Sequence, residues 1–279
     1  MSEVSLRYHE RAAPFGLARH VKCVWRLQGP ASEHTVPEPV IPDGCVEIVL
    51  NLGDPFLRHR GPGQRQAQPL LLVAGQLTEA ITIEPSGRVD LLGVRFHPWS
   101  AAAFLGVSAR ELQDEVLGLD EVRPELAGPL GVLSGAPPER CEALLEKLLI
   151  RRGSAVRPLV PGLARLAAHV AEHRPAMSVN GIARWAGLST RRVQGLFAEH
   201  VGMSPKQLMR IRRFQRALGL ARSEPALSWS SIAVRAGYYD QAHLVHESRA
   251  LAGCPPSALV MRGAGLTEAF LEHPSGAAA

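Results

Sequence analysis

Apolar and polar residues alternate between turn residues over the first hundred positions, a pattern typical of β-strands. Residues 46–51, 80–84 and 89–96 alternate most clearly. Pro42-Asp43-Gly44 precedes the first of these segments, and Pro85-Ser86-Gly87 separates the other two. We therefore predict strands at all three segments and a hairpin that joins 80–84 to 89–96.

The next segments predict a loop and then helices. Residues 60–69 are rich in Gly, Pro and Gln and predict a flexible loop between strands. From Ser100 onward the apolar spacing becomes helical. Residues 138–150 predict an amphipathic helix whose apolar face holds Leu144, Leu145, Leu148 and Leu149. This face fits either packing within the chain or a seam between two copies of it.

A break in the pattern divides the chain into two domains. Gly153, Pro158 and Pro161 interrupt it, and Leu163, Leu166, Ala167 and Val170 then lie on one face of a new helix. We predict a β-rich domain over residues 1–150 and a linker over 151–161. An all-helical domain follows over 162–262, and a flexible tail over 263–279.

The helical half contains an internal repeat. Residues 182–188 (IARWAGL) recur as 232–238 (IAVRAGY) with an offset of 50, and 202–205 (GMSP) recur as 253–256 (GCPP) with an offset of 51. Each unit has a serine to cap a short helix, a glycine to end it in the left-handed conformation, and an apolar plug. In the first unit these are the cap Ser178, the glycine Gly187 and the plug Leu188. In the second unit they are Ser230, Gly237 and Tyr238. This order predicts two helix-turn-helix units, in which the second helix enters the major groove of DNA.

The second helix of the first unit is predicted over residues 190–200, with Ser189 as its cap and Val193, Leu196 and Phe197 buried. Its polar side chains face outward near its start: Thr190, Arg191, Arg192 and Gln194. Arg reads guanine and Gln reads adenine through paired hydrogen bonds. The matching positions of the second unit hold Tyr239, Gln241, Ala242, His243 and His246.

A helix predicted from Ser204-Pro205 to about Ala221 joins the two units. It carries four arginines, namely Arg210, Arg212, Arg213 and Arg216. We assign Arg212 to contact with DNA phosphate. A rigid joining helix would hold the two reading helices for successive major-groove turns, about 34 Å apart.

Charge also separates the two halves. The 279 residues have a formal net charge of +5, but residues 1–150 hold 14 Lys and Arg against 19 Asp and Glu, whereas residues 151–279 hold 17 against 7. The excess positive charge therefore lies with the repeat, as an anionic partner requires.

No apolar run approaches the roughly 20 residues of a membrane span, and the N-terminus lacks an apolar signal segment. The four cysteines are scattered, so we expect a cytoplasmic protein without membrane partner, disulfide, metal or other cofactor.

Residues 163–260 together resemble the DNA-binding domain of AraC-type transcriptional regulators. The shared landmarks are the Ala and Gly of each unit, the Ser and Leu-Phe of the first reading helix, Gly-x-Ser-Pro, and the Arg-rich joining helix. The resemblance implies that the base-reading positions are Arg191, Gln194 and Gly195 in the first unit and Gln241, Ala242, His243 and His246 in the second.

Three departures from the family pattern affect the reading helices. His246 stands where the family has Arg, Ser248 where it has a buried aromatic residue, and Gly195 where it has Arg. Gly inside a helix costs about 0.5–1 kcal/mol relative to Ala. We therefore expect the second unit to read bases less selectively.

Residues 1–150 resemble, more loosely, an N-terminal domain attached to such DNA-binding domains. The similar segments are 42–47 (PDGCVE), 75–78 (GQLT) and 93–98 (GVRFHP). The resemblance implies a barrel-like sensor that binds an effector and mediates dimerisation, and an α+β fold for the whole chain. We assign effector contact to four residues: Trp25, Glu47, Arg95 and His97.

The sequence therefore predicts a transcriptional regulator and not an enzyme. Its partners would be operator DNA and a small-molecule effector, with contact to RNA polymerase and homodimerisation left open. One alternative is a small-molecule-modifying or metal-binding β-barrel enzyme that uses His34, Glu47 or His97. Another is a non-specific, nucleoid-type DNA binder. The chain has no Gly-x-Ser-x-Gly elbow, phosphate loop or HExxH helix that would support catalysis.

Overall fold

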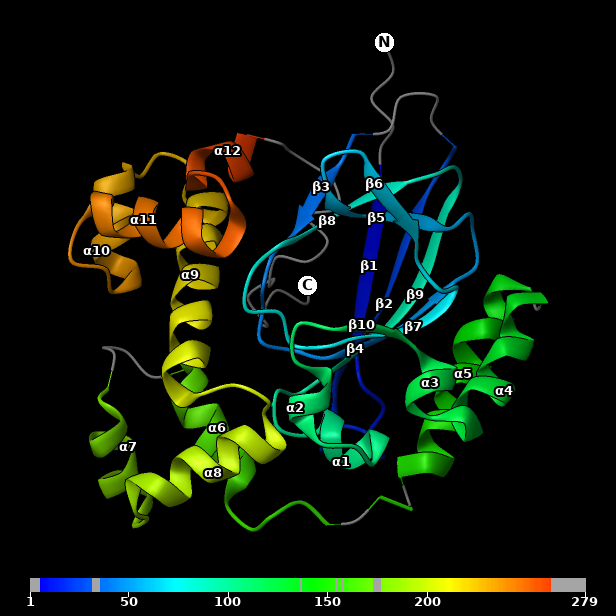
Figure 1. Ribbon diagram of the computed structural model, residues 1–279, viewed down its shortest axis with the longest axis horizontal. Helices are drawn as coiled ribbons and strands as arrows, with labels where there is room; N and C mark the ends of the chain where they lie inside the picture. The colour runs from blue at the N-terminus through cyan, green and yellow to red at the C-terminus, as the bar shows by residue number, and fades with distance from the viewer. Residues whose placement is uncertain are drawn as a thin grey trace.

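Two β-sheets, a group of short helices and a helical domain make up the computed structural model (Figure 1). The structure describes residues 6–31, 36–135, 137–153, 155–156, 158–172 and 177–261. The predicted tail, 263–279, and His34 lie outside these residues. The β-rich N-terminal half and the helical C-terminal half confirm the predicted α+β fold.

The larger sheet has six antiparallel strands in the order β1-β2-β9-β4-β7-β10. Their bounds are β1 Arg7–Ala12, β2 Val21–Gly29, β4 Glu47–Asn51, β7 Leu71–Ala74, β9 Val89–Phe96 and β10 Val116–Gly118. The smaller sheet has the order β3-β8-β5-β6, also antiparallel. Its strands are β3 Glu38–Val40, β5 Phe56–Gly61, β6 Gln64–Ala67 and β8 Ile81–Pro85. The two separate sheets replace a closed barrel.

The predicted hairpin between 80–84 and 89–96 is wrong, although both strands exist. β8 pairs with β3 and β5 in the smaller sheet, whereas β9 pairs with β2 and β4 in the larger one. Asp54 holds the connection between them, because its carboxylate accepts a hydrogen bond from the backbone N–H of Arg88 at 2.6 Å. The chain therefore crosses from one sheet to the other at a turn that, in sequence, looks like a hairpin turn.

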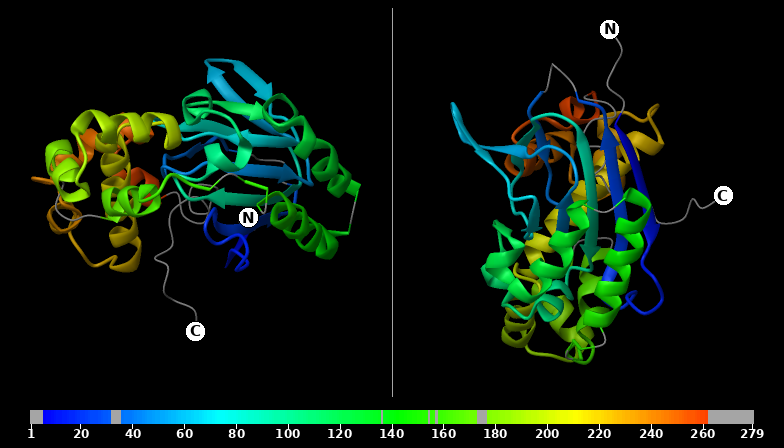
Figure 2. Two further views of the ribbon diagram at one scale, coloured as in Figure 1. Left: turned by 90° about the horizontal axis from the view of Figure 1, so that it is seen from below. Right: turned by 90° about the vertical axis from the view of Figure 1, so that its right-hand side faces the viewer.

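The predicted loop over 60–69 is also wrong. Residues 56–67 form the hairpin of β5 and β6, with Gly63 in the left-handed conformation at φ +70°. All four residues of β6 are exposed, and Figure 2 shows the hairpin projecting from the rest of the domain. Because neither face of β6 is buried, its sequence lacks the alternation that marks a strand.

Both faces of the six-stranded sheet are buried. Side chains such as Trp25, Leu27 and Val49 pack toward the smaller sheet with Phe56 and Ile83. Alternate side chains along each strand point to the other face of the sheet, and these pack against the helices. These helices are α1 Ala101–Leu105, α2 Ala109–Leu112, α3 Leu119–Val122, α4 Pro124–Gly131, the short 3-10 helix η1 Val132–Gly135, and α5 Pro138–Gly153.

The predicted leucine face of 138–150 is partly buried within the chain. Leu145 and Leu149 are 1% exposed and pack in the core beside Cys141, whereas Leu144 is 40% exposed. Helix α5 continues to Gly153 and so includes the first three residues of the predicted linker.

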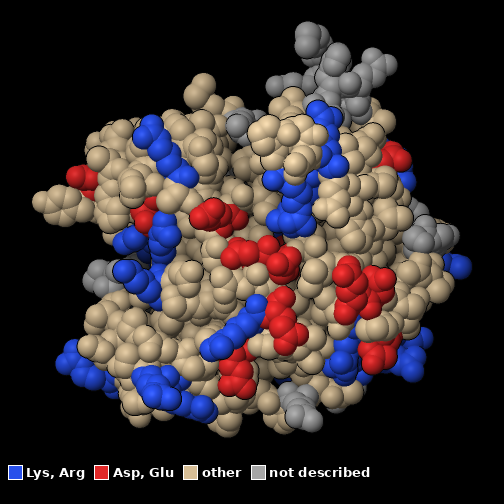
Figure 3. Space-filling view, viewed as in Figure 1, with Lys and Arg blue, Asp and Glu red and all other residues tan. Residues whose placement is uncertain are grey.

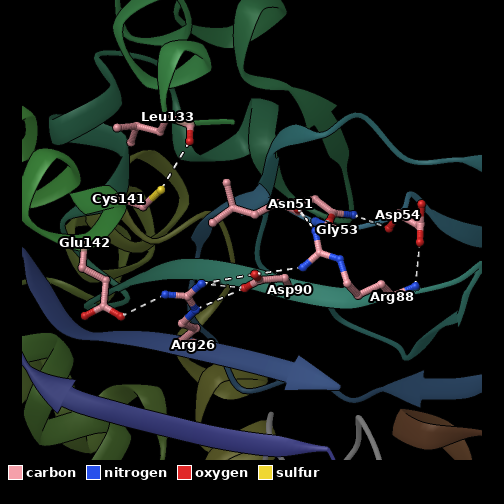
Figure 4. A network of polar contacts seen from close by, with 10 residues as sticks. Arg26, Asn51, Gly53, Asp54, Arg88, Asp90, Leu133, Cys141 and Glu142 are labelled. Atoms are coloured by element: carbon pink, nitrogen blue, oxygen red, sulfur yellow. Dashed lines mark hydrogen bonds and ion pairs between the residues drawn. The ribbon is translucent and has the colours of Figure 1, made fainter. Parts of the chain in front are cut away.

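A charged network fixes this helix to the sheet (Figure 4). Arg26 on β2 donates to both carboxylate oxygens of Asp90 on β9, at 3.0 and 3.2 Å. Its other guanidinium nitrogen lies 3.6 Å from Glu142 on α5, and Arg88 lies 3.2 Å from Asp90. The network therefore joins two strands and one helix around a guanidinium that is largely removed from water.

His20 makes the stability of this domain depend on pH. Its side chain is buried against Phe104, and neither ring nitrogen has a hydrogen-bond partner among the described residues. Burial, with the nearby charges of Arg19 and His97, lowers the pKa of His20 from 6.5 to about 4. The unfolded chain therefore binds a proton more readily, and stability falls as pH drops from about 6.5 to about 4. We expect His20→Leu to flatten this part of a plot of melting temperature against pH. An unchanged slope in the variant would contradict this role for His20.

In the described residues of the C-terminal half, the helices are α6 Leu163–Glu172, α7 Val179–Ala186, α8 Thr190–His200, α9 Pro205–Ser223, α10 Trp229–Ala236, α11 Gln241–Ala252 and α12 Pro256–Met261. Their core contains the predicted face of Leu163, Leu166, Ala167 and Val170, together with Phe197 and Phe214. Among the described residues, no helix is both long enough and apolar enough to cross a membrane.

Candidate nucleic-acid interface

The repeat in the sequence is a repeat of hydrogen bonds in the structure. Ser178 caps α7 by accepting from the N–H of Gly181, and Ser228, 50 residues later, caps α10 by accepting from Ser231. Ser189 caps α8, and Asp240, 51 residues later, caps α11. The predicted cap Ser230 is wrong, since this residue lies inside α10. The sequence has three serines within 228–231, and only the geometry of the helix start distinguishes them.

The two units differ at the residue after the turn. Gly187 and Gly237 both end their helices in the left-handed conformation, at φ +66° and +94°. Tyr238 is buried as the predicted plug, and the guanidinium of Arg213 on α9 lies 4.5 Å from its ring centre. Leu188 is 37% exposed, so the predicted plug of the first unit is wrong. Helix α9 packs along α10 and α11 and places Arg213 beside the ring of Tyr238.

One side-chain hydrogen bond orients each reading helix. The hydroxyl of Thr190 at the start of α8 donates to the side-chain oxygen of Asn180 at 2.9 Å. In the second unit, Ser230 is equivalent to Asn180 and Gln241 on α11 is equivalent to Thr190. The hydroxyl of Ser230 donates to the side-chain oxygen of Gln241 at 2.9 Å. Thr190 and Gln241 are therefore used, at least in part, to position their helices.

The outer face of α8 presents the predicted base-reading residues. Val193, Leu196 and Phe197 are buried, whereas Arg191, Arg192 and Gln194 are exposed. Gly195 is exposed as well, and a Cβ atom there would have open space around it. The first turn of α8 therefore offers two guanidinium groups and one amide to a ligand.

The face of α11 is less polar. Tyr239 precedes the helix and is 89% exposed, and Ala242 and His246 are exposed on it. His243 is half-buried, with its ring edge-on to Tyr238 at 5.1 Å between ring centres. Gln241 is exposed but bonded to Ser230, whereas His246 presents an exposed imidazole in the second turn of the helix.

Helix α9 joins the two units (Figure 1). Ser204 and Gln207 form a capping box at its start, with Pro205 in the first turn. Its 19 residues correspond to about 28 Å at 1.5 Å per residue. Helix α9 packs against α8, α10 and α11, so it holds the two units in one arrangement.

Three of the five arginines of α9 bind the second unit. Glu247 on α11 lies 2.7 Å from Arg210 and 3.4 Å from Arg213, and Arg216 donates to the backbone oxygen of Ala236 at 3.4 Å. Glu247 has only 10% of its side chain exposed. Arg212 is half-buried on another side of the helix. Arg210, Arg213 and Arg216 therefore hold the second unit in place, and the assignment of Arg212 to a phosphate contact stays a prediction.

One departure from the family pattern, Ser248, lies next to this ion cluster. Glu247 and Ser248 stand where the first unit has Leu196 and Phe197. Ser248 is fully buried and its hydroxyl donates to the backbone oxygen of Cys254 at 2.7 Å. Polar contacts therefore replace apolar ones in holding α11 to the rest of the domain.

In the β-domain, three of the four predicted effector residues lie together between the sheets. Glu47 and Arg95 are paired across β4 and β9, with the Arg95 Nε 2.5 Å from a Glu47 carboxylate oxygen. Trp25 packs over Gly93, whose backbone leaves room for the indole ring. Burial alone would lower the pKa of Arg95, but the carboxylates of Glu47 and Asp43 raise it above its ordinary value. Within the described residues, the Nη2 atom of Arg95 is buried without a hydrogen-bond partner.

His97 does not belong to this cluster. It follows the end of β9, stacks on Trp99 at 4.8 Å between ring centres, and contacts the backbone oxygen of Ala18 at 3.1 Å. Burial lowers its pKa. The alternation of β9 extends to His97 in sequence, but the strand ends at Phe96, so sequence reasoning places this ring on the wrong surface.

The β-domain contacts both ends of the helical domain. Ile41 is buried in the helical core, and Gln215 on α9 donates to the backbone oxygen of Pro42 at 2.6 Å. Ala80 donates to Leu251 on α11 at 2.8 Å, and α1 and α2 pack against α8. On the face in Figure 3, acidic side chains gather where the halves meet, and Lys and Arg lie toward the outer edge of the helical domain. No sequence signal marked Ile41 or Pro42 as interdomain contacts.

Two families match separate parts of the chain. Residues 182–262 match a family described as a helix-turn-helix domain. Residues 9–118 match a domain of unknown function, DUF6597.

Solved structures and one curated protein are also similar. An apo ToxT variant from Vibrio cholerae has a TM-score of 0.50 at 8% identity, over 90% of this chain and 99% of that chain, and shows the fold. The AraC-like transcriptional activator CuxR has a TM-score of 0.29 at 14% identity, over 77% of this chain and 87% of that chain. Ras and Rab interactor 1 of Rattus norvegicus is 33% identical over 175 residues, or 60% of this chain. The chain spans about a fifth of that protein, 21% of its length.

Proposed function

We propose that this chain, an AraC-type regulator by its helix-turn-helix domain and its two-domain fold, binds operator DNA sequence-specifically through α8 and α11 and regulates transcription. Arg191 and Gln194 read bases in one major-groove turn. Gln241, His243 and His246 approach bases in the next, with Ala242 and Tyr239 in apolar contact. Thr190 and Arg192 lie at the edges of the first contact and face phosphate.

The observation that carries this proposal is the duplicated geometry of the two units. The same caps, left-handed glycines and cross-helix hydrogen bonds recur at offsets of 50 and 51 residues. A duplicated fold would follow from packing alone, but both units also present the start of the second helix to solvent. Two exposed helix starts joined by one rigid helix are the arrangement that reading of two major-groove turns requires.

In this function the β-domain carries an effector site. The cluster of Trp25, Glu47 and Arg95 is the candidate site, because the Nη2 atom of Arg95 remains to be satisfied there. A ligand could alter DNA binding from this cluster, since Asp43, 3.4 Å from Arg95, adjoins the Pro42 backbone that contacts α9. Homodimerisation and contact with RNA polymerase belong to the proposal as further partners. A regulator with these partners works in the cytoplasm, where the DNA lies.

Binding-site selection tests the proposal. Purified full-length protein would be incubated with a pool of random duplexes, and bound duplexes would be amplified and sequenced. We expect one enriched motif with two half-sites about 10 base pairs apart, matching one turn of DNA. A nucleoid-type binder would enrich no motif, and that result would reject sequence-specific reading.

Arg212 provides a test of non-specific contact. If its guanidinium neutralises one phosphate, Arg212→Ala weakens binding to selected and random duplexes by the same factor. It also lowers the slope of log K against log salt by about one. The measurement is a salt titration of both duplexes by fluorescence anisotropy. Unequal losses on the two duplexes would show that Arg212 reads bases or supports a reading helix.

A further inference from the structure

A cavity lies where the helices of the β-domain meet the end of the first reading helix. It has a volume of about 660 Å³, within the range of sites for small organic ligands. The turn from α1 to α2 forms one wall, and the segment before α6 forms another. Glu199 and His200, the last residues of α8, close a third side. The cavity thus touches both domains and lies apart from the cluster between the sheets.

Two arginines give this cavity its charge. Arg123 lies between α3 and α4, and Arg152 lies in the last turn of α5. The Nε of Arg152 donates to the backbone oxygen of Phe104 at 3.1 Å, which leaves its two terminal nitrogens for other partners. The Nε of Arg123 is buried and, within the described residues, has no hydrogen-bond partner. The same Nε atom lies 3.5 Å from a carboxylate oxygen of Glu125, whose side chain is 73% exposed.

Both guanidinium groups line the same cavity. Burial lowers the pKa of Arg152, the charge of Arg123 lowers it further, and the charge of Glu125 raises it. Gly106, with φ +74°, brings Arg123 close to the backbone, since a Cβ atom there would lie 3.2 Å from an Arg123 terminal nitrogen. The bond from Arg152 to the backbone oxygen of Phe104 can be explained by capping of the end of α1. Capping does not explain why the positive charge of Arg123 lines the same cavity.

The rest of the lining is apolar apart from Ser108 and from Glu199 and His200 at the end of α8. Ala102, Ala103, Val107, Leu159 and Val160 contribute methyl and methylene groups. A ligand for this cavity therefore needs a negative group for the guanidinium pair and an apolar body for these side chains. Planar guanidinium groups bind both carboxylate and phosphate oxygens through paired hydrogen bonds.

We propose that this cavity is a binding site for a small amphipathic anion, a carboxylate or phosphate with an apolar body, held by Arg123 and Arg152. An anion bound there contacts the β-domain and the end of α8 together, so it favours one placement of the first reading helix. This regulatory consequence rests on the proposed DNA-binding function, whereas the binding itself does not. Binding can shift the placement only if the anion prefers one arrangement of the domains.

Calorimetric titration of the full-length protein tests the site with three probes: hexanoate, hexyl phosphate and the neutral analogue hexanamide. The test variant is the double substitution Arg123→Gln with Arg152→Gln. The matched control is Arg191→Gln with Arg192→Gln, which removes two arginines from the reading face. We expect saturable binding of at least one anion to the wild type and the control, and binding at least about tenfold weaker to the double variant. Hexanamide should not bind.

The results distinguish a carboxylate ligand from a phosphate ligand, and anion binding from regulation of DNA binding. Tighter binding of hexanoate assigns the site to carboxylates, and tighter binding of hexyl phosphate assigns it to phosphates. Absence of saturable binding by both anions, or equal binding to the double variant, overturns the site. Should the double variant not fold, Arg152→Lys replaces it, because Lys keeps the charge but loses the planar fork and should still weaken binding. If the anion binds but leaves affinity for the selected duplex unchanged, the regulatory role fails while the DNA-binding function stands.

Discussion

Arg191→Ala should weaken binding to the selected operator by about 1–3 kcal/mol, or roughly 5- to 150-fold, and relax the base preference at one position. Arg191 is exposed in the first turn of α8, where Ser189 caps the helix and the bond from Thr190 to Asn180 fixes its direction. A guanidinium held this way can donate two hydrogen bonds to guanine. Removing it should leave binding to random duplexes nearly unchanged, because the phosphate contacts remain.

The measurement is the ratio of affinities for selected and random duplexes at one salt concentration. Arg60→Ala, on the β5 strand of the exposed hairpin, is the matched control, because it removes the same charge far from the reading helices. We expect the ratio to fall for Arg191→Ala and to stay at the wild-type value for the control. An unchanged ratio in Arg191→Ala would show that α8 does not read bases through this residue.

Glu247→Ala should lower the free energy of unfolding by about 2–3 kcal/mol, because it leaves Arg210 and Arg213 side by side without their shared carboxylate. Both arginines are partly exposed, which keeps this loss below that of a fully buried ion pair. Helix α11 would lose its polar contact with α9, and with it the fixed position of the second reading unit. Denaturant unfolding of wild type and variant measures the loss.

Glu224→Gln is the matched control for this prediction. Glu224 pairs with Arg235 at 2.6 Å, but 42% and 46% of the two side chains are exposed. Water screens such a pair, so the substitution should leave unfolding unchanged within error. Equal losses for Glu247→Ala and Glu224→Gln would contradict the structural role of the cluster under α11.

The helical half could be predicted closely from the sequence because its signals are local. Capping serines, left-handed glycines and an apolar spacing of three and four residues each act within one or two turns. The predicted helices over 190–200 and from 205 to about 221 therefore agree with α8 and α9 to within two residues. Leu188 and Ser230 were misplaced because their environment depends on α9 and on helix-start geometry.

The β-rich half could be predicted only in part, because strand pairing is not local. The sequence shows the strands 46–51 and 89–96 but not that β9 lies between β2 and β4. The exchange of sheets after β8 depends on Asp54, more than thirty residues away from Arg88 in the chain. Contacts between the domains, such as Gln215 with Pro42, are 173 residues apart and leave no periodic pattern.

The effector residues show the same limit. Glu47 and Arg95 meet because β4 and β9 pair in one register, which the alternation of each strand permits but does not specify. The arginines at 123 and 152 are spread over irregular connections and helix ends, so no motif joins them. Their common cavity becomes visible only when α1, α5 and α8 are placed together.

Guanine methylation protection on the selected operator tests the central claim most directly, because it reports contact at the N7 atom in the major groove. Two helix-turn-helix units joined by α9 predict two protected clusters about one helical turn apart. Arg191→Ala should remove protection within one cluster and leave the other. Uniform protection, or protection in a single cluster that Arg191→Ala does not change, would contradict reading of DNA by the two units.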